Sequence, residues 1–173
     1  LNAFGGRVEL GGLATTGTIG LNSDGDNFSL SFPEGVERSD VTLINQARVN
    51  VRAGDGGSIA VNAQNLEMTG GSALFAGIDT DLGDDGSRAG NIDINVTGAI
   101  DLKDGSLINN DVRSQARGQG GDVNISANTL QLENGARVSV DTFGSGRGGS
   151  LTITAQDIQV IGGENGLTGL FAD

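Results

Sequence analysis

The sequence predicts an all-β fold, a parallel β-helix (a β-solenoid) whose coils each contain three short strands. Three observations predict it. Apolar and polar residues alternate over short stretches, which is typical of half-buried strands and not of helices. A Gly-rich motif recurs about every 30 residues, as in solenoid repeats. Gly accounts for 31 of the 173 residues and Pro for only one, so many tight turns are expected.

Residues 1–44 are expected to form irregular N-terminal β-helix coils. The alternation is looser in this part, but four stretches still have the pattern of a strand, and turns rich in Gly or Asp separate them. The stretches contain Val8 and Leu10; Ile19 and Leu21; Phe28, Leu30 and Phe32; and Val41 and Leu43.

Residues 45–173 are expected to form the repeat β-helix coils, each of about 28–33 residues. Four copies of a Gly-Gly-x-apolar-x-apolar motif align, and their anchor glycines are 33, 31 and 28 residues apart. The anchors are Gly57, Gly90, Gly121 and Gly149. A further coil begins at Gly162 and Gly163 and is expected to be truncated at the C-terminus.

Equivalent strands of successive repeats carry similar residues, which favours parallel stacking of coils over a sandwich or barrel of hairpins. Stacking predicts three interior ladders, with small alanines at one corner (Ala63, Ala127 and Ala155) and asparagine ladders at the turns (Asn62, Asn95 and Asn124; Asn65 and Asn128). The apolar ladders are Ile59, Ile92, Val123 and Leu151; Leu66, Ile100, Leu130 and Ile158; and Leu74, Ile108 and Val138.

Three N-terminal segments and the repeats resemble a known family. The segments are FGGRVELGGL at 4–13, GTIGL at 17–21 and LSFPEGV at 30–36. They resemble the end of the haemagglutination-activity domain of two-partner-secretion, filamentous-haemagglutinin-like exoproteins. The Gly-Gly-x-Ile-x-Ile repeats resemble the solenoid that follows this domain in large cyanobacterial exoproteins. The chain is therefore expected to lie just after the haemagglutination-activity domain.

The resemblance implies a right-handed β-helix, export through an outer-membrane β-barrel transporter, and display at the bacterial cell surface. The family's Asn-Pro secretion motifs are absent, since the only proline is Pro33, so these residues are not expected to contact the transporter. The N-terminus lacks the architecture of a signal peptide, and an exported chain is then expected to be an internal piece of a longer precursor.

Composition excludes several functions. The net charge of −12 disfavours binding to nucleic acid or to anionic lipid, and no apolar run is long enough for membrane insertion as a helix. The chain has no His and no Cys, which excludes His-based acid–base catalysis and zinc sites that use these ligands. The acidic residues mostly occupy turns and do not form an evident carboxylate pair. We therefore expect no enzyme, with a β-helical polysaccharide lyase or glycosidase as the remote alternative.

An arginine recurs shortly before each glycine pair, and stacking would align these arginines as a basic stripe. The functional interpretation is a binding strip for anionic polysaccharide; the alternative, which we favour, is pairing with nearby Asp or solvation. The six Phe residues are scattered and Trp and Tyr are absent, so no strong sugar site is expected. The candidate ligand contacts are Arg52, Arg88, Arg117 and Arg147.

No cofactor is expected, apart from calcium as a weak candidate. Residues 79–86 and 24–27 are rich in Asp and could supply oxygen ligands to Ca²⁺, but neither segment has the spacing of an EF-hand or of a calcium-binding nonapeptide repeat. Asp and Asn that stabilise turns are the interpretation we favour.

The sequence thus predicts a structural and adhesive segment of a secreted bacterial surface protein, the shaft of a haemagglutinin-like adhesin. A polysaccharide-binding module that uses the arginine-containing loops is the main alternative. Exposed strand edges at the ends of a coil stack tend to pair, so end-to-end self-association is also expected.

Overall fold

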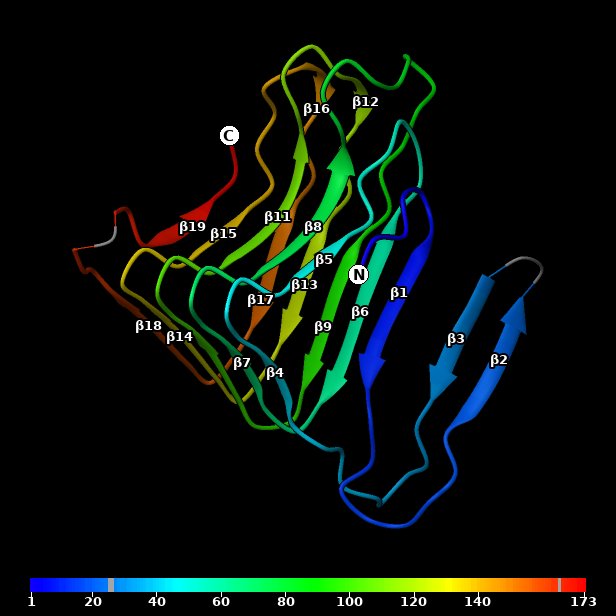
Figure 1. The fold of residues 1–173 in the computed structure, drawn as a ribbon, viewed down its shortest axis with the longest axis vertical. Helices are drawn as coiled ribbons and strands as arrows, with labels where there is room; N and C mark the ends of the chain where they lie inside the picture. Colours follow the sequence, from blue (N-terminus) through cyan, green and yellow to red (C-terminus); the bar gives the residue numbers. More distant parts are fainter. Residues whose placement is uncertain (25–26, 165) are drawn as a thin grey trace.

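A computed structural model describes residues 1–24, 27–164 and 166–173. Within these ranges the strands form three five-stranded parallel sheets that wrap around one core (Figure 1). Sheet 1 contains β1 (Arg7–Gly11), β6 (Ser58–Ala63), β9 (Ile92–Val96), β13 (Val123–Ser126) and β17 (Leu151–Thr154). Sheet 2 contains β4 (Val41–Leu43), β7 (Leu66–Met68), β10 (Ala99–Leu102), β14 (Thr129–Glu133) and β18 (Asp157–Ile161). Sheet 3 contains β5 (Arg48–Asn50), β8 (Ala73–Ile78), β11 (Leu107–Val112), β15 (Arg137–Ser139) and β19 (Gly169–Phe171).

The chain passes through sheets 1, 2 and 3 in turn and then starts the next coil, so the neighbours within each sheet come from successive coils. The prediction of an all-β parallel solenoid with three strands per coil is confirmed. The described residues contain no helix, and therefore none that could cross a membrane.

The three predicted ladders are present in the predicted register. Ile92 pairs with Ile59 and Val123, Ile100 pairs with Leu66 and Leu130, and Ile108 pairs with Leu74 and Val138. All nine of these side chains are at most 1% exposed. The period-two alternation is therefore explained by the fold, because in each of the three sheets one face of the strands points into the solenoid.

The same ladders become exposed in the last coil. Ile158 continues the ladder of Leu130, yet it is 47% exposed, and Val160 in the same strand is 48% exposed. These side chains have a packing partner on one side only. End-to-end self-association stays a prediction.

The turns between sheets 2 and 3 have the same backbone conformation in four consecutive coils. Each uses two adjacent residues with positive φ, between 50° and 86°, a backbone conformation that Asn, Asp and Gly adopt most easily. The pairs are Asn45 and Gln46, Gly70 and Gly71, Asp104 and Gly105, and Asn134 and Gly135.

The anchor glycines lie where successive coils touch backbone to backbone. A Cβ on Gly121 would lie 2.0 Å from the carbonyl oxygen of Gly90, and a Cβ on Gly149 would lie 1.9 Å from that of Gly121. No side chain can be placed at such a distance without moving a coil. The repeated glycine is thus a requirement of close stacking.

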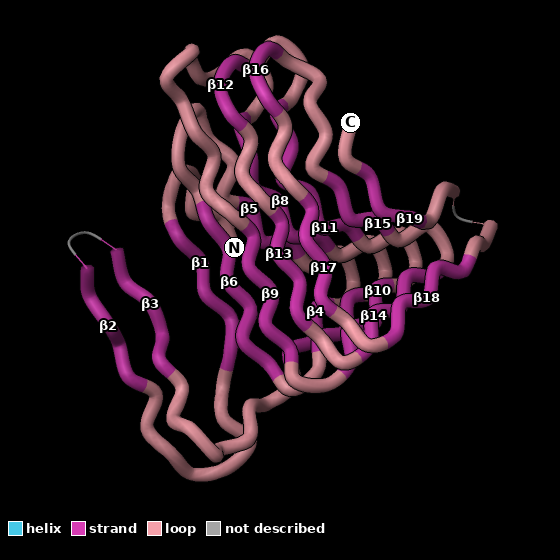
Figure 2. The backbone as a smooth tube through the Cα atoms, turned by 180° about the vertical axis from the view of Figure 1, so that it is seen from behind, coloured by secondary structure: helices cyan, strands magenta, loops and turns pink. Residues whose placement is uncertain are grey.

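The segment between β1 and β4 leaves the solenoid, which corrects the expectation of coils throughout residues 1–44. Its strands β2 (Gly20–Asp24) and β3 (Asn27–Ser31) pair antiparallel as a hairpin that stands beside sheet 1 (Figures 1 and 2). The stretches containing Leu21 and Leu30 do form strands. The two strands run antiparallel, however, and they pair with each other instead of with neighbouring coils.

The predicted asparagine ladders are mostly wrong. Asn62 and Asn95 are in register, but Asn124 pairs with Asp93 and donates its Nδ2 to Oδ1 of Asp93 at 2.9 Å. The Nδ2 of Asn65 likewise donates to Asp40, at 2.8 Å. Amide–carboxylate pairs therefore connect coils where amide–amide pairs were expected, and the charged acceptor makes the stronger hydrogen bond.

Candidate functional site

The predicted arginine stripe exists only in part. Two short strands, β12 (Arg117–Gln119) and β16 (Ser145–Arg147), extend the loops before the glycine pairs, and they are parallel. Gln119 pairs with Arg147 on one side and with Arg88 on the other, and the Arg88 guanidinium donates to the Gln119 side chain. Arg117 is in register with Ser145, so it is not stacked with Arg88 and Arg147. We call Arg88, Arg117 and Arg147, which are all exposed, the loop arginines.

Arg52 does not belong to this stripe, which corrects the prediction. It lies two residues after the end of β5, on the outer face of sheet 3, and it is only 8% exposed. Between β5 and β6 the chain has no strand equivalent to β12, so Arg52 keeps the outward alternation of Arg48 and Asn50.

The acidic loop at 79–86 uses its carboxylates for local contacts. Oδ1 of Asp84 accepts a hydrogen bond from the backbone N–H of Gly86 at 2.8 Å, and Oδ1 of Asp79 accepts one from Thr80 at 2.9 Å. Among the described residues no three acidic side chains come close enough to hold a metal ion. Part of the second predicted calcium segment, residues 25 and 26, lies outside the described residues.

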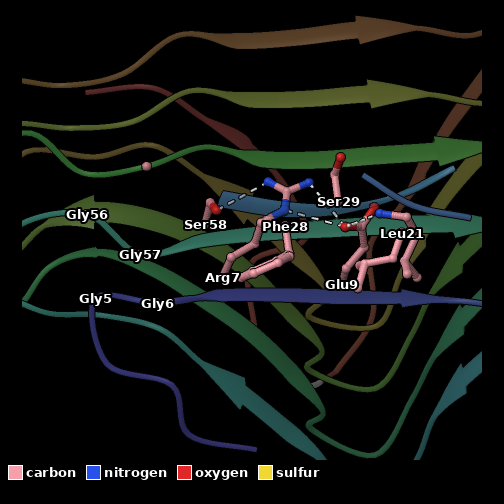
Figure 3. Close-up of a pocket in the computed structure, with 12 residues that line it drawn as sticks. Gly5, Gly6, Arg7, Glu9, Leu21, Phe28, Ser29, Gly56, Gly57 and Ser58 are labelled. Atoms are coloured by element: carbon pink, nitrogen blue, oxygen red, sulfur yellow. Dashed lines mark hydrogen bonds and ion pairs between the residues drawn. The ribbon is translucent and has the colours of Figure 1, made fainter. Parts of the chain in front are cut away.

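A first cavity, of about 610 Å³, lies between the hairpin and the glycine turns at the start of sheet 1 (Figure 3). Its charged groups already contact each other or the hairpin. Oε2 of Glu9 lies 3.4 Å from Nε of Arg7 and accepts the backbone N–H of Leu30 at 3.0 Å. Arg7 also donates to Ser58 at 3.3 Å. These contacts attach the hairpin to sheet 1, and we interpret this cavity as a structural junction.

A second cavity is an open groove of about 720 Å³ on the outer face of sheet 3. We call it the arginine groove. It collects basic, aromatic and uncharged polar side chains from four successive coils. Its lining residues are Arg48, Arg52, Phe75, Thr80, Asn109, Asp111, Arg113, Ser114 and Phe143.

The alternation of the third strand of each coil builds this groove. Residues at one set of alternate positions, such as Val49, Leu74 and Ile108, point into the core. The positions between them point outward and are stacked by the sheet register, which aligns Asn50, Phe75, Asn109 and Ser139. The groove is therefore the outer face of sheet 3 together with the loop ends that follow its strands.

Asp111 organises the floor of the arginine groove. The residue is 5% exposed, and both of its carboxylate oxygens have partners. Oδ1 accepts from Oγ of Ser139 at 2.9 Å and from the backbone N–H of Asp141 at 3.1 Å. Oδ2 accepts from Nδ2 of Asn109 at 3.0 Å and lies 4.0 Å from Nη2 of Arg52. A buried carboxylate with this many partners is held in one position.

Arg52 is fixed in the same way. Its Nε donates to the carbonyl oxygen of Ala76 at 3.3 Å, and its guanidinium stacks 4.2 Å from the centre of the Phe75 ring. Burial and the nearby Arg113 lower the pKa of Arg52, while Asp111 and Asp79 act in the opposite direction. An arginine nevertheless remains protonated, so the groove keeps this positive charge.

The rim of the arginine groove is exposed. Arg113 lies 3.6 Å from Asp79, and the two side chains are 46% and 38% exposed. The Arg48 guanidinium is 6.0 Å from the centre of the Phe75 ring, and Phe143 is 65% exposed. Sequence reasoning missed this site, apart from Arg52. The signal it could have used is the polar residues at alternate positions, Asn50 and Arg52, which occupy the same places in their coil as Asn109 and Asp111 in a later one.

Fold and site together define a parallel β-solenoid with a basic, aromatic-lined groove on one of its three sheets. Comparison of the chain with models of protein families, with curated proteins and with solved structures found no match.

Proposed function

We propose that the chain is a structural and adhesive segment of a secreted bacterial surface protein, in which the solenoid serves as a stiff shaft. The observation that carries this proposal is the residue-by-residue pairing of successive coils in all three sheets. In such a stack each coil contacts only its neighbours, and their backbone hydrogen bonds are shared along the whole length.

Two other features support a shaft. The chain has no Cys, so no disulfide stabilises the stack. Its stability comes from burial of apolar side chains, which form one continuous cluster through the three sheets in the part of the chain that the structure describes. The net charge of −12 keeps neighbouring rods apart and in solution. Export by an outer-membrane β-barrel transporter and display at the cell surface are part of the proposal, and they rest on the resemblance of residues 4–36 and of the repeats to the exoprotein family.

Stretching of single molecules tests the shaft. A chain held at its two termini should resist extension and then unfold in discrete steps, each of which releases one coil. A coil of about 28–33 residues corresponds to roughly 10 nm of extended chain. The same chain in strong denaturant is the control. Smooth extension at low force under native conditions would contradict the proposal, because a shaft must hold its length under load.

The loop arginines support a second candidate function, polysaccharide binding along the loop column. Arg88 and Arg147 are exposed in one ladder, with Gln119 between them. A double variant, Arg88→Gln with Arg147→Gln, should lose binding to an acidic polysaccharide if this column is the binding site. Unchanged binding would assign the contact to another surface.

A further inference from the structure

We infer that the arginine groove on sheet 3 is a binding site for an acidic polysaccharide chain. This inference rests on the proposed adhesive function and names its ligand class. It differs from the loop-column interpretation in its residues, since of the four arginines predicted from the sequence only Arg52 lines the groove.

Charge is the first argument. The chain has ten basic and 22 acidic residues, yet the lining of the arginine groove contains three arginines and one aspartate. The aspartate, Asp111, is buried and fully engaged on the floor, and its nearest cation is Arg52. Arg48 and Arg113 lie at the rim. Carboxylate or sulfate groups of a ligand can meet Arg48 in pairs of hydrogen bonds and can replace the exposed Asp79 as the partner of Arg113.

The aromatic side chains are the second argument. Phe75 and Phe143 are far apart in the sequence but line the same groove, which their scattered positions in the sequence did not indicate. Phe143 leaves most of its ring open to solvent, whereas Phe75 is half-buried in the same lining and has the Arg52 guanidinium 4.2 Å from its ring centre. Rings with exposed faces pack against the apolar C–H face of a sugar.

The uncharged polar groups are the third argument. Thr80, Asn109 and Ser114 line the groove and offer partners for sugar hydroxyls. The amide oxygen of Asn109 is buried and accepts no hydrogen bond, although its Nδ2 is held by Asp111. This oxygen has almost no surface open to solvent, so a ligand hydroxyl reaches it only when the Asn109 side chain turns toward the groove. The groove also has the volume of sites that hold small ligands.

Calorimetric titration of the chain with a galacturonic acid oligosaccharide tests the inference, with a neutral galactose oligosaccharide of the same length beside it. We expect binding of the acidic sugar only, and weaker binding at higher salt. The double variant Arg48→Gln with Arg113→Gln should weaken binding about tenfold or more, because both rim cations are lost. Phe143→Ala should weaken it about fivefold through loss of the stacking surface.

The matched control is the double variant Arg88→Gln with Arg147→Gln, which removes the same charge from exposed positions outside the groove. It should bind within about twofold of the unchanged chain. Equal losses in both double variants would overturn the groove as the site, and so would failure of the unchanged chain to bind. Circular dichroism of each variant verifies folding. The stretching experiment uses no ligand. A negative result there contradicts the shaft, whereas a negative titration contradicts only the binding site in the groove.

Discussion

The side chains of Asp104 and Asn134 are hydrogen-bonded to each other across two successive coils. Nδ2 of Asn134 donates to Oδ1 of Asp104 at 2.7 Å. The two residues occupy the same place in consecutive turns, with φ of 52° and 50°. Thr69, in the preceding coil, donates its hydroxyl to Oδ2 of Asp104 at 2.8 Å. One carboxylate thus connects three coils at the turn, beyond the hydrogen bonds of the sheets.

These bonds make a prediction about acid stability. Hydrogen bonds from Asn134 and then Thr69 hold the pKa of the Asp104 carboxyl below its ordinary value. A depressed pKa in the folded state means that the carboxylate stabilises the fold above the unfolded pKa, near 4, and that this contribution is lost as the pH falls through the folded value. Asp104→Asn should therefore lower the urea midpoint at pH 7. At pH 3 it should differ less from the unchanged chain. An equal difference at both pH values would contradict this explanation.

Asp141 should behave in the opposite way. Burial is the largest cause and raises the pKa of its carboxyl. The hydrogen bond from the backbone N–H of Asp173 opposes this rise, and the negative charges of Asp111 and Asp173 add to it. A raised pKa means that the folded state binds the proton more tightly. Stability from this group is thus present below the unfolded pKa and is lost as the pH rises through the folded value. Asp141→Asn should raise the urea midpoint at pH 7. A lower midpoint at pH 7 would show that the charge is needed.

Close stacking of the anchor glycines predicts a large cost for the smallest side chain. Gly121→Ala should lower the free energy of unfolding by about 2 kcal/mol or more, because the new Cβ would overlap the carbonyl oxygen of Gly90. Gly162→Ala is the matched control, since nothing lies within 4 Å of a Cβ there. It should change stability by roughly 0.5 kcal/mol or less. Urea denaturation of both variants measures the difference, and similar losses would argue against backbone contact between coils.

The ladder that contains Leu130 and Ile158 predicts how stability is distributed along the stack. Leu130 is 1% exposed, and Leu130→Ala should cost about 2–5 kcal/mol through lost burial and the cavity that remains. Ile158 pairs with it in the next coil but is 47% exposed, and Ile158→Ala should cost less than about 1 kcal/mol. Denaturation curves of the two variants compare one ladder position in two environments. Equal costs would mean that Ile158 is covered in solution.

The sequence predicted the ladders correctly because each apolar position recurs with the repeat, and a register error would turn every side chain to the wrong face. The loops do not repeat in this way, so their conformation could not be predicted from the repeat. The lengths of the loops vary, so the sequence alone did not reveal that Arg52 lies two residues after β5 while Arg117 begins an additional strand. Asn124 was misplaced for a related reason: it was grouped by residue type, while the register aligns it with Asp93.

The arginine groove was beyond prediction from single repeats, because no repeat contains it. Phe75 and Phe143 come from different coils, and only the stacking of the coils brings them to one surface. The outward positions of sheet 3 vary from coil to coil, whereas the inward positions repeat. A search for repetition therefore finds the core and passes over the variable positions that form the groove.

The assembly of the groove from four coils has a consequence for changes in chain length. A solenoid tolerates loss or duplication of a whole coil, since any coil can pair with any other of the same shape. Removal of the coil that carries Asn109 and Asp111 would leave a shorter rod in which Phe75 is in register with Ser139, and the groove would lose its polar floor. The stacking of coils therefore does not depend on their order, whereas the groove forms only when its four coils follow one another as they do in this chain.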